Sequence, residues 1–213
     1  ALQEARSFGT TVEAADLTGR VDCRRQAVVT IDPDDAKDFD DAICLERAEA
    51  DQWRLWVHIA DVSHYVKPAS ALDAEARKRG NSTYLVDRVI PMLPEALSNE
   101  LCSLKPAVDR LTKCVEFLLS HDGRVLHTKF FAAVIHSQRR LSYQEAFAIL
   151  QRKPDEPIEQ MLHQAHELAQ RLRRARFKAG SLELDFPEMK IRLDEHGRVV
   201  RIEKVVNDVS HQL

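Results

Sequence analysis

Six aspartates are crowded into the ten residues from Asp32 to Asp41, directly after the apolar run 27–31. Two carboxylates about 4 Å apart repel each other by roughly 4 kcal/mol at an effective dielectric constant near 20. Several carboxylates fixed around one point would shift their pKa values or open the loop unless a cation neutralised them. Because the run contains no Cys or His and offers only oxygen donors, it predicts a hard ion, Mg²⁺ or Mn²⁺, in preference to zinc.

The run has two other interpretations. An EF-hand calcium loop counted from Asp32 needs Gly at the sixth position and Glu at the twelfth, but Lys37 and Ile43 stand there, which excludes that motif. A solvated turn is the simpler alternative, since Asp favours turns. The last aspartates of the run lie against a predicted strand, and this placement favours metal binding.

The composition is that of an ordinary folded protein. With 213 residues, 44% hydrophobic and 31% charged, the chain can form one large domain or two small ones. The formal charge of −3 argues against a uniformly basic nucleic-acid binder, although a local basic face remains compatible with it. The four cysteines form no C-x-x-C pair, so neither a zinc site nor a disulfide framework is expected. No membrane span or signal peptide is recognised, and a cytoplasmic location is predicted.

Hydrophobic periodicity predicts an α+β fold, a curved mixed or antiparallel sheet with peripheral helices, preceded by a leader over residues 1–20. The predicted strands are 27–32, 41–47, 53–60, 82–86, 112–120, 124–135, 182–186, 189–193 and 199–205. The predicted helices are 70–79, 143–151 and 158–178. Ser142 with Glu145 forms a capping box for the second helix, and His121-Asp-Gly123 is typical of a hairpin turn.

The aspartate run is part of a longer pattern. Residues 30–43, Thr-Ile-Asp-Pro-Asp-Asp-Ala-Lys-Asp-Phe-Asp-Asp-Ala-Ile, resemble the signature of the ribonuclease II and ribonuclease R family of exoribonucleases. The resemblance continues, in the same order and spacing, through residues 57–66, 72–77, 80–84, 90–94 and 97–104. From about residue 18 onward, the chain resembles the N-terminal part of that family's catalytic domain.

The resemblance implies a processive, metal-dependent hydrolase that degrades single-stranded RNA from its 3′ end and releases nucleoside 5′-monophosphates. Residue by residue, it implies metal ligands at Asp32, Asp38, Asp40 and Asp41, with Asp38 and Asp40 also catalytic. In such a two-metal scheme the ions lie roughly 3.5–4 Å apart, one activating the attacking water and the other stabilising the leaving oxygen. Asp34 and Asp35 do not match ligand positions and are assigned to the turn.

The resemblance also implies contacts with RNA. Tyr84 matches the tyrosine that packs on the RNA 3′ end, where base stacking is worth about 1–3 kcal/mol and does not depend on sequence. From composition alone, a buried strand tyrosine is an equally good interpretation. The resemblance implies a second aromatic clamp within residues 180–186. Leu184 stands where the family has Phe, so Phe186 is the candidate to take over that role.

Independently of the resemblance, the charges of Arg77, Arg79 and Arg140 make them candidates for phosphate contacts in the cationic wall of an RNA channel. For any single one of them, a solvated surface charge is the simpler interpretation.

The sequence ends at Leu213, where the family continues into helices and an arginine-bearing motif. We therefore expect the second half of the catalytic domain and flanking OB-type RNA-binding domains as partners, and low activity from these residues alone. The competing hypothesis is an RNA-binding or assembly module of the same fold that performs no chemistry. A third hypothesis, a phosphatase acting on small molecules, predicts activity on mononucleotides.

Overall fold

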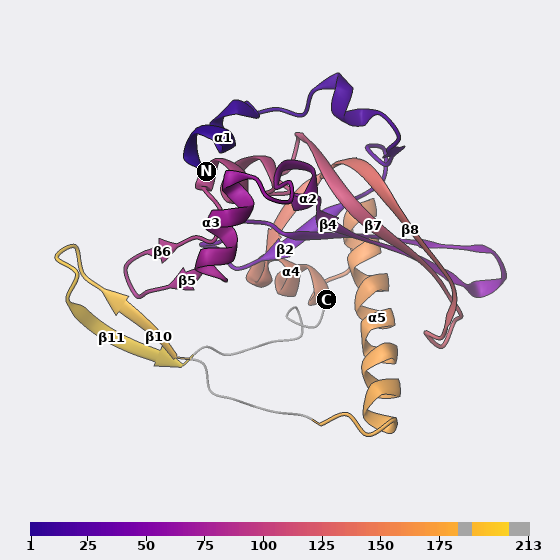
Figure 1. Ribbon diagram of the computed structural model, residues 1–213. Helices are drawn as coiled ribbons and strands as arrows, with labels where there is room; N and C mark the ends of the chain where they lie inside the picture. Colours follow the sequence, from indigo (N-terminus) through magenta and orange to yellow (C-terminus); the bar gives the residue numbers. More distant parts are fainter. Residues whose placement is uncertain (183–188, 205–213) are drawn as a thin grey trace.

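The computed structural model describes residues 1–182 and 189–204 and is built around one curved seven-stranded sheet (Figure 1). The strand order is β1-β8-β7-β4-β3-β2-β9. These strands are β1 (Val21–Asp22), β2 (Val29–Asp32), β3 (Asp41–Arg47), β4 (Trp53–Ala60), β7 (Asp109–Leu119), β8 (Val125–His136) and β9 (Arg139–Ser142). Strand β1 pairs with β8 in parallel, β9 pairs with β2 in parallel, and the other pairs are antiparallel. The sheet is therefore mixed, as predicted.

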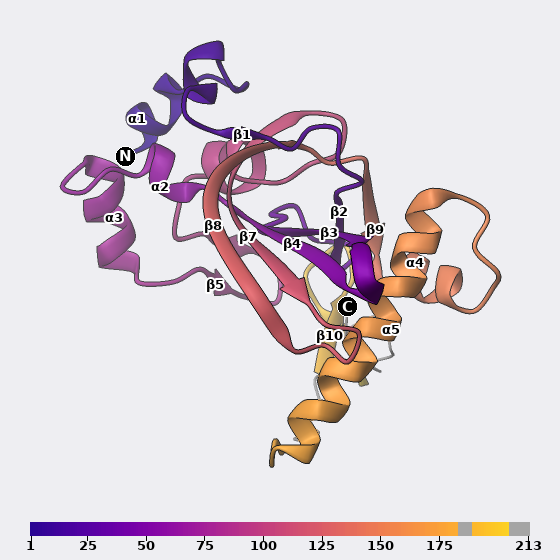
Figure 2. The ribbon, with the colours of Figure 1, turned by 90° about the vertical axis from the view of Figure 1, so that its right-hand side faces the viewer.

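Helices and two small hairpins surround this sheet (Figures 1 and 2). The helices are α1 (Leu2–Ser7), η1 (Ala14–Leu17), η2 (Glu49–Asp51), α2 (Val62–Tyr65), α3 (Ala71–Arg79), the π-helix η3 (Ala96–Leu101), α4 (Tyr143–Leu150) and α5 (Pro157–Lys178). The hairpins are β5 (Thr83–Tyr84) with β6 (Val89–Ile90), and β10 (Met189–Leu193) with β11 (Val199–Lys204). The predicted α+β class is confirmed. Across the described ranges, no helix combines the length and the apolar character that a membrane crossing requires.

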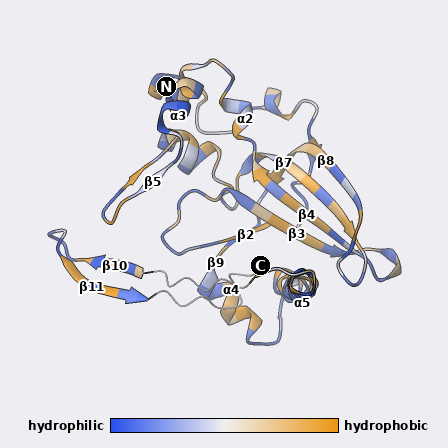
Figure 3. Cartoon of the chain, turned by 60° about the horizontal axis from the view of Figure 1, so that its bottom comes forward, coloured by the Kyte–Doolittle hydropathy of each residue, from blue (hydrophilic) through white to orange (hydrophobic). Residues whose placement is uncertain are grey.

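Both faces of the sheet are covered, and each carries its own hydrophobic core. Because successive side chains of a strand point to opposite faces, Ala42 and Cys44 of β3 lie in one core and Leu45 in the other. The first core packs against α1, α2 and α3, and the second against α4 and α5. Figure 3 shows the hydrophobic stretches along β4 and β7 that contribute to these cores.

Local sequence signals fix several element boundaries. The Ser142 hydroxyl accepts a hydrogen bond from the Glu145 N–H, and the Glu145 carboxylate accepts one from the Ser142 N–H, so the predicted capping box is confirmed. Gly123 has a φ of +87° in the β7–β8 hairpin, and a Cβ there would lie 2.9 Å from Leu172 Cδ2 of α5. Glycine is therefore needed both for the turn and for the close approach of α5. Strand β5 is shorter than the predicted 82–86.

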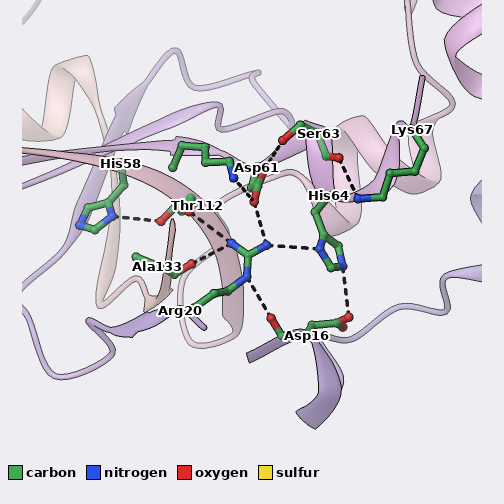
Figure 4. Close-up of polar contacts among 10 residues, drawn as sticks. Asp16, Arg20, His58, Asp61, Ser63, His64, Lys67, Thr112 and Ala133 are labelled. Atoms are coloured by element: carbon green, nitrogen blue, oxygen red, sulfur yellow. Dashed lines mark hydrogen bonds and ion pairs between the residues drawn. The ribbon is translucent and has the colours of Figure 1, made fainter. Parts of the chain in front are cut away.

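A buried polar cluster joins residues 14–20 to the end of β4 (Figure 4). The Arg20 guanidinium donates to the Asp61 carboxylate at 2.8 Å and to the Asp16 carbonyl at 2.9 Å. The His64 ring bridges Arg20 and Asp16, with one nitrogen 3.2 Å from Arg20 Nη2 and the other 3.1 Å from the Asp16 carboxylate. Burial alone would raise the pKa of Asp61, but hydrogen bonds from Ser63 and Arg20 together lower it. The cluster thus keeps a buried carboxylate ionised.

We expect Arg20→Ala to lower the free energy of unfolding by up to about 3–5 kcal/mol, because it removes the buried cation from the Asp61 carboxylate and leaves only the Ser63 hydroxyl and the more exposed Lys113 ammonium as partners. The measurement is equilibrium unfolding in urea. The matched control is Arg24→Ala, which removes pairs with Asp22 and Asp109 that are open to solvent and should cost about 0–1 kcal/mol. Equal losses in the two variants would contradict this account of the cluster.

Candidate metal and nucleic-acid site

The aspartate run borders a cleft of about 960 Å³. Asp32, Asp38 and Asp40 line it together with Tyr84 of the β5–β6 hairpin. Met189, Lys190 and Ile191 of β10 contribute another part of the lining. The cleft therefore joins segments far apart in the sequence, and it collects three of the four predicted metal ligands with the predicted stacking residue.

Different elements position the carboxylates. Asp32 ends β2, where it is the register partner of Ser142 in β9. Asp38 and Asp40 lie on an extended segment whose side chains alternate, since Phe39 between them is only 8% exposed and belongs to the first core. The Asp40 carbonyl accepts a hydrogen bond from the Ala60 N–H at 2.9 Å, which ties this segment to the end of β4.

Asp41, the fourth predicted ligand, is exposed at the start of β3 and is not among the residues that line the cleft. Asp34 and Asp35 lie in the turn, as predicted.

Burial and mutual repulsion both act on the carboxylates of the loop. Burial, followed by the charge of Asp41, raises the pKa of Asp32 to about 6. Burial and the charges of Asp38 and Asp41 also raise the pKa of Asp40. Tyr84 donates a long hydrogen bond of 3.4 Å to the Asp38 carboxylate, and burial together with that carboxylate raises the pKa of the phenol. The arrangement is one in which added positive charge would be stabilising.

The donor set fits a hard divalent cation in chemistry, and in part in geometry. Asp32 Oδ2 is buried and has no hydrogen-bond partner in the described part of the chain, so it is a free oxygen donor. However, no three His, Cys, Asp or Glu side chains within residues 1–182 and 189–204 come close enough to hold a metal ion. The carboxylates would therefore have to turn toward one another to bind one.

Of the residues predicted to contact RNA, Tyr84 lines the cleft and the two arginines of α3 do not. Tyr84 is 67% exposed at the cleft, which argues against the alternative of a buried core tyrosine. Arg77 and Arg79 lie on α3 and do not line the cleft, and each pairs with an acid one turn earlier in the helix. Arg79 also donates to the carbonyl of Pro91, a residue of the cleft wall. Phe186, like Leu184, lies outside the described residues.

Two cations near the aspartate run had no predicted role at this loop. Lys190 pairs with Asp35 at 2.7 Å, which joins β10 to the turn and holds the pKa of that carboxyl below its usual value. Arg140, predicted only as a possible part of a cationic RNA channel, donates to the Pro33 carbonyl at 2.6 Å and lies over the Phe39 ring. Both contacts join residues more than a hundred positions apart, and no local sequence signal could have identified them.

Comparison with known proteins gives a consistent assignment. The sequence profile described as RNB domain matches residues 20–213. The chain belongs to the RNB domain family. Ribonuclease R of Thermotoga maritima is 48% identical over 206 residues, and that of Escherichia coli K12 is 45% identical over 216. These matches cover 94% and 99% of this chain but only 29% and 27% of the relatives, so the chain spans less than a third of their length.

The fold of this RNB chain also matches a solved ribonuclease R. The structure described as Mycoplasma genitalium RNase R in complex with ribose methylated single-stranded RNA has a TM-score of 0.90 and 33% identity, covering 99% of this chain and 33% of that one. The predicted relationship to ribonucleases of this family is thus confirmed.

We expect Asp32→Asn to raise the melting temperature of the chain in EDTA at pH 7.5. The folded-state pKa of about 6 lies above the unfolded value near 3.9, so stability from protonated Asp32 is present below pH 4 and lost as the pH rises through 6. At pH 4 the variant and the natural chain should therefore differ much less. Mg²⁺ should stabilise the natural chain but not the variant. Differential scanning calorimetry, with and without Mg²⁺, measures the melting temperatures of the natural chain and the variant.

The matched control is Asp34→Asn, which removes the same charge from an exposed position in the turn of the same loop. It should leave the response to pH and to Mg²⁺ unchanged. An equal effect of both substitutions would mean that total charge, and not the buried position of Asp32, governs the loop.

Proposed function

We propose that the chain provides the carboxylate half of the active site of a processive, metal-dependent exoribonuclease that hydrolyses single-stranded RNA from its 3′ end to nucleoside 5′-monophosphates. The observation that carries the proposal is the cleft in which Asp32, Asp38 and Asp40 face the exposed ring of Tyr84. Close relatives named ribonuclease R and a similar structure whose description includes single-stranded RNA support it.

Asp32, Asp38, Asp40 and Asp41 would hold Mg²⁺, with Mn²⁺ as the alternative, since hard oxygen donors suit both ions. A bound divalent cation would supply Lewis-acid stabilisation of the charge that develops on the scissile phosphodiester. Asp38 and Asp40 would hold it from the extended segment, where alternation keeps both carboxylates on the cleft side. Tyr84 would stack on a base at the 3′ end and place the last phosphodiester beside the carboxylates.

We further propose that other parts of a longer protein complete the site. The curated relatives are more than three times as long as the stretch matched here, which leaves room for the second half of the catalytic domain and for OB-type RNA-binding domains. Arg77 and Arg79 are proposed as phosphate contacts at the edge of the same surface, and the location of the protein is proposed to be cytoplasmic. The alternative is a catalytically silent module of the same fold that binds RNA.

Asp40→Asn tests the catalytic proposal. In the full-length protein that carries this sequence, it should slow the release of nucleoside 5′-monophosphates from a single-stranded oligonucleotide by more than about a hundredfold, since even indirect partners of a metal commonly matter by 10–100-fold. Affinity for the same RNA should change little, because the variant keeps the shape of the loop. Asp34→Asn, with the same charge change in the exposed turn, should remain active.

Three results would distinguish the proposed exoribonuclease from its alternatives. If Asp40→Asn retained full turnover, the assignment of the carboxylates would be wrong. If the natural protein bound RNA but never released mononucleotides, the silent module would be the correct interpretation. A rate independent of oligonucleotide length, with hydrolysis of mononucleotides, would identify a phosphatase.

Tyr84→Ala tests the stacking role. Removing the ring should weaken binding of a short single-stranded oligonucleotide by about 1–3 kcal/mol, whatever its base sequence. Tyr84→Phe keeps the ring and loses only the long hydrogen bond to Asp38, so it should bind nearly as well. Fluorescence anisotropy measures both affinities. Equal losses in Tyr84→Phe and Tyr84→Ala would show that the hydroxyl, and not the ring, makes the contact.

A further inference from the structure

Ser103 contacts the aspartate loop, is not among the residues that line the cleft, and has a fully buried side chain. Its hydroxyl donates to the Lys37 carbonyl at 2.8 Å and accepts from the Phe39 N–H at 3.1 Å. These two groups belong to the two peptide bonds on either side of Asp38. One side chain therefore restrains both backbone dihedral angles of Asp38.

The next residue continues the same pairing. The Leu104 N–H donates to the Phe39 carbonyl at 2.8 Å, so residues 103 and 104 take the place of a neighbouring strand along a segment that has no strand partner there. Ser103 is itself held, because its carbonyl accepts a hydrogen bond of 2.8 Å from the buried Arg110 guanidinium. The support behind Asp38 is thus fixed to β7, a central strand of the sheet.

A serine suits this position for a chemical reason. Among small side chains, only a hydroxyl can donate to a carbonyl and accept from an N–H with one atom. Alanine would leave the Phe39 N–H and the Lys37 carbonyl without these bonds, and the Asp38 backbone could rotate. Since Phe39 anchors the segment in the core between the two carboxylates, rotation at Asp38 would change where both carboxylates point.

We propose that Ser103 is a positioning residue that fixes the backbone on both sides of Asp38, so that only the side chains of Asp38 and Asp40 have to turn to bind a divalent cation in the cleft. The inference rests on the proposed metal-binding function of the loop and extends it to a residue that touches neither metal nor RNA. It predicts that metal affinity, and not only stability, depends on the Ser103 hydroxyl.

The test compares Ser103→Ala with Ser137→Ala in the 213-residue chain. Ser137 is equally buried and donates a long hydrogen bond of 3.5 Å to the Val28 carbonyl, away from the loop, so it is a matched control for loss of a buried hydroxyl. Two quantities are measured: the Kd for Mn²⁺ by electron paramagnetic resonance, and the hydrogen-exchange rate of the Phe39 amide by NMR.

In Ser103→Ala we expect the Phe39 amide to exchange at least about tenfold faster and the Kd for Mn²⁺ to rise about tenfold, the usual scale for a partner that orients a metal ligand. Ser137→Ala should change neither quantity. Ser103→Thr keeps the hydroxyl and should restore Mn²⁺ binding toward the natural value.

Asp40→Asn separates failure of this inference from failure of the proposed function. If Asp40→Asn abolishes Mn²⁺ binding while Ser103→Ala leaves the Kd unchanged, Ser103 is merely structural and the inference is overturned. An unchanged Phe39 exchange rate in Ser103→Ala overturns it as well. If only the full-length protein that carries this sequence binds Mn²⁺, the same variants are compared in that protein. If neither the natural chain nor the full-length protein binds Mn²⁺, the metal site itself is wrong, and the positioning role falls with it.

Discussion

The site depends on a balance between carboxylate repulsion and backbone hydrogen bonding in the segment from Lys37 to Asp40. Within the described residues, four hydrogen bonds hold the backbone of that segment. The Ser103 hydroxyl donates one and accepts another, and the Leu104 and Ala60 amides donate one each. At roughly 0.5–1.5 kcal/mol each, they contribute about as much as one pair of carboxylates at 4 Å would cost. These hydrogen bonds can therefore hold the carboxylates near one another without a cation. They do not supply enough free energy to bring the carboxylates still closer together. The pKa values of Asp32 and Asp40 rise mainly because burial disfavours the charged form, and neighbouring carboxylates add to the rise although no three of the acidic side chains described converge on one point.

The sequence predicts those structural features, such as helix caps, turns and strand alternation, that depend on residues close together in the chain. The capping box at Ser142, the glycine turn at Gly123 and the alternation along β4 each depend on residues a few positions apart, so their physical causes can be read directly. The parallel pairing of β9 with β2 was not predictable in this way. It joins residue 29 to residue 139, and nothing in either strand specifies the other. Periodicity predicted a mixed or antiparallel sheet but could not give its strand order.

The same distinction applies to the candidate site. The acids of the loop were conspicuous because their crowding is local, and the exposure of Tyr84 agrees with the role that the family resemblance implies. The sequence motif 97–104 was recognised as part of that resemblance, yet it suggested no function for Ser103. Its hydrogen bonds reach back 64 and 66 residues, and a buried serine has no distinctive pattern. Lys190 and Asp35 are 155 residues apart, so their ion pair is even harder to predict from the sequence than the Ser103 contacts.

The spacing of the carboxylates is consequently set by elements outside the loop. Asp32 is placed by β2 and its partner β9, whereas Asp38 and Asp40 are placed by the chain after η3 and by the end of β4. These supports approach the loop from different parts of the sheet, and the exposed turn between them only has to be long enough to connect the two. Because a metal site tolerates errors of only a fraction of an ångström in ligand position, such a site is better built on rigid supports than on the conformation of a loop. The aspartate run is therefore conspicuous in the sequence, while the residues that give it a defined geometry are ordinary serines and backbone amides in strands and helices distant from it.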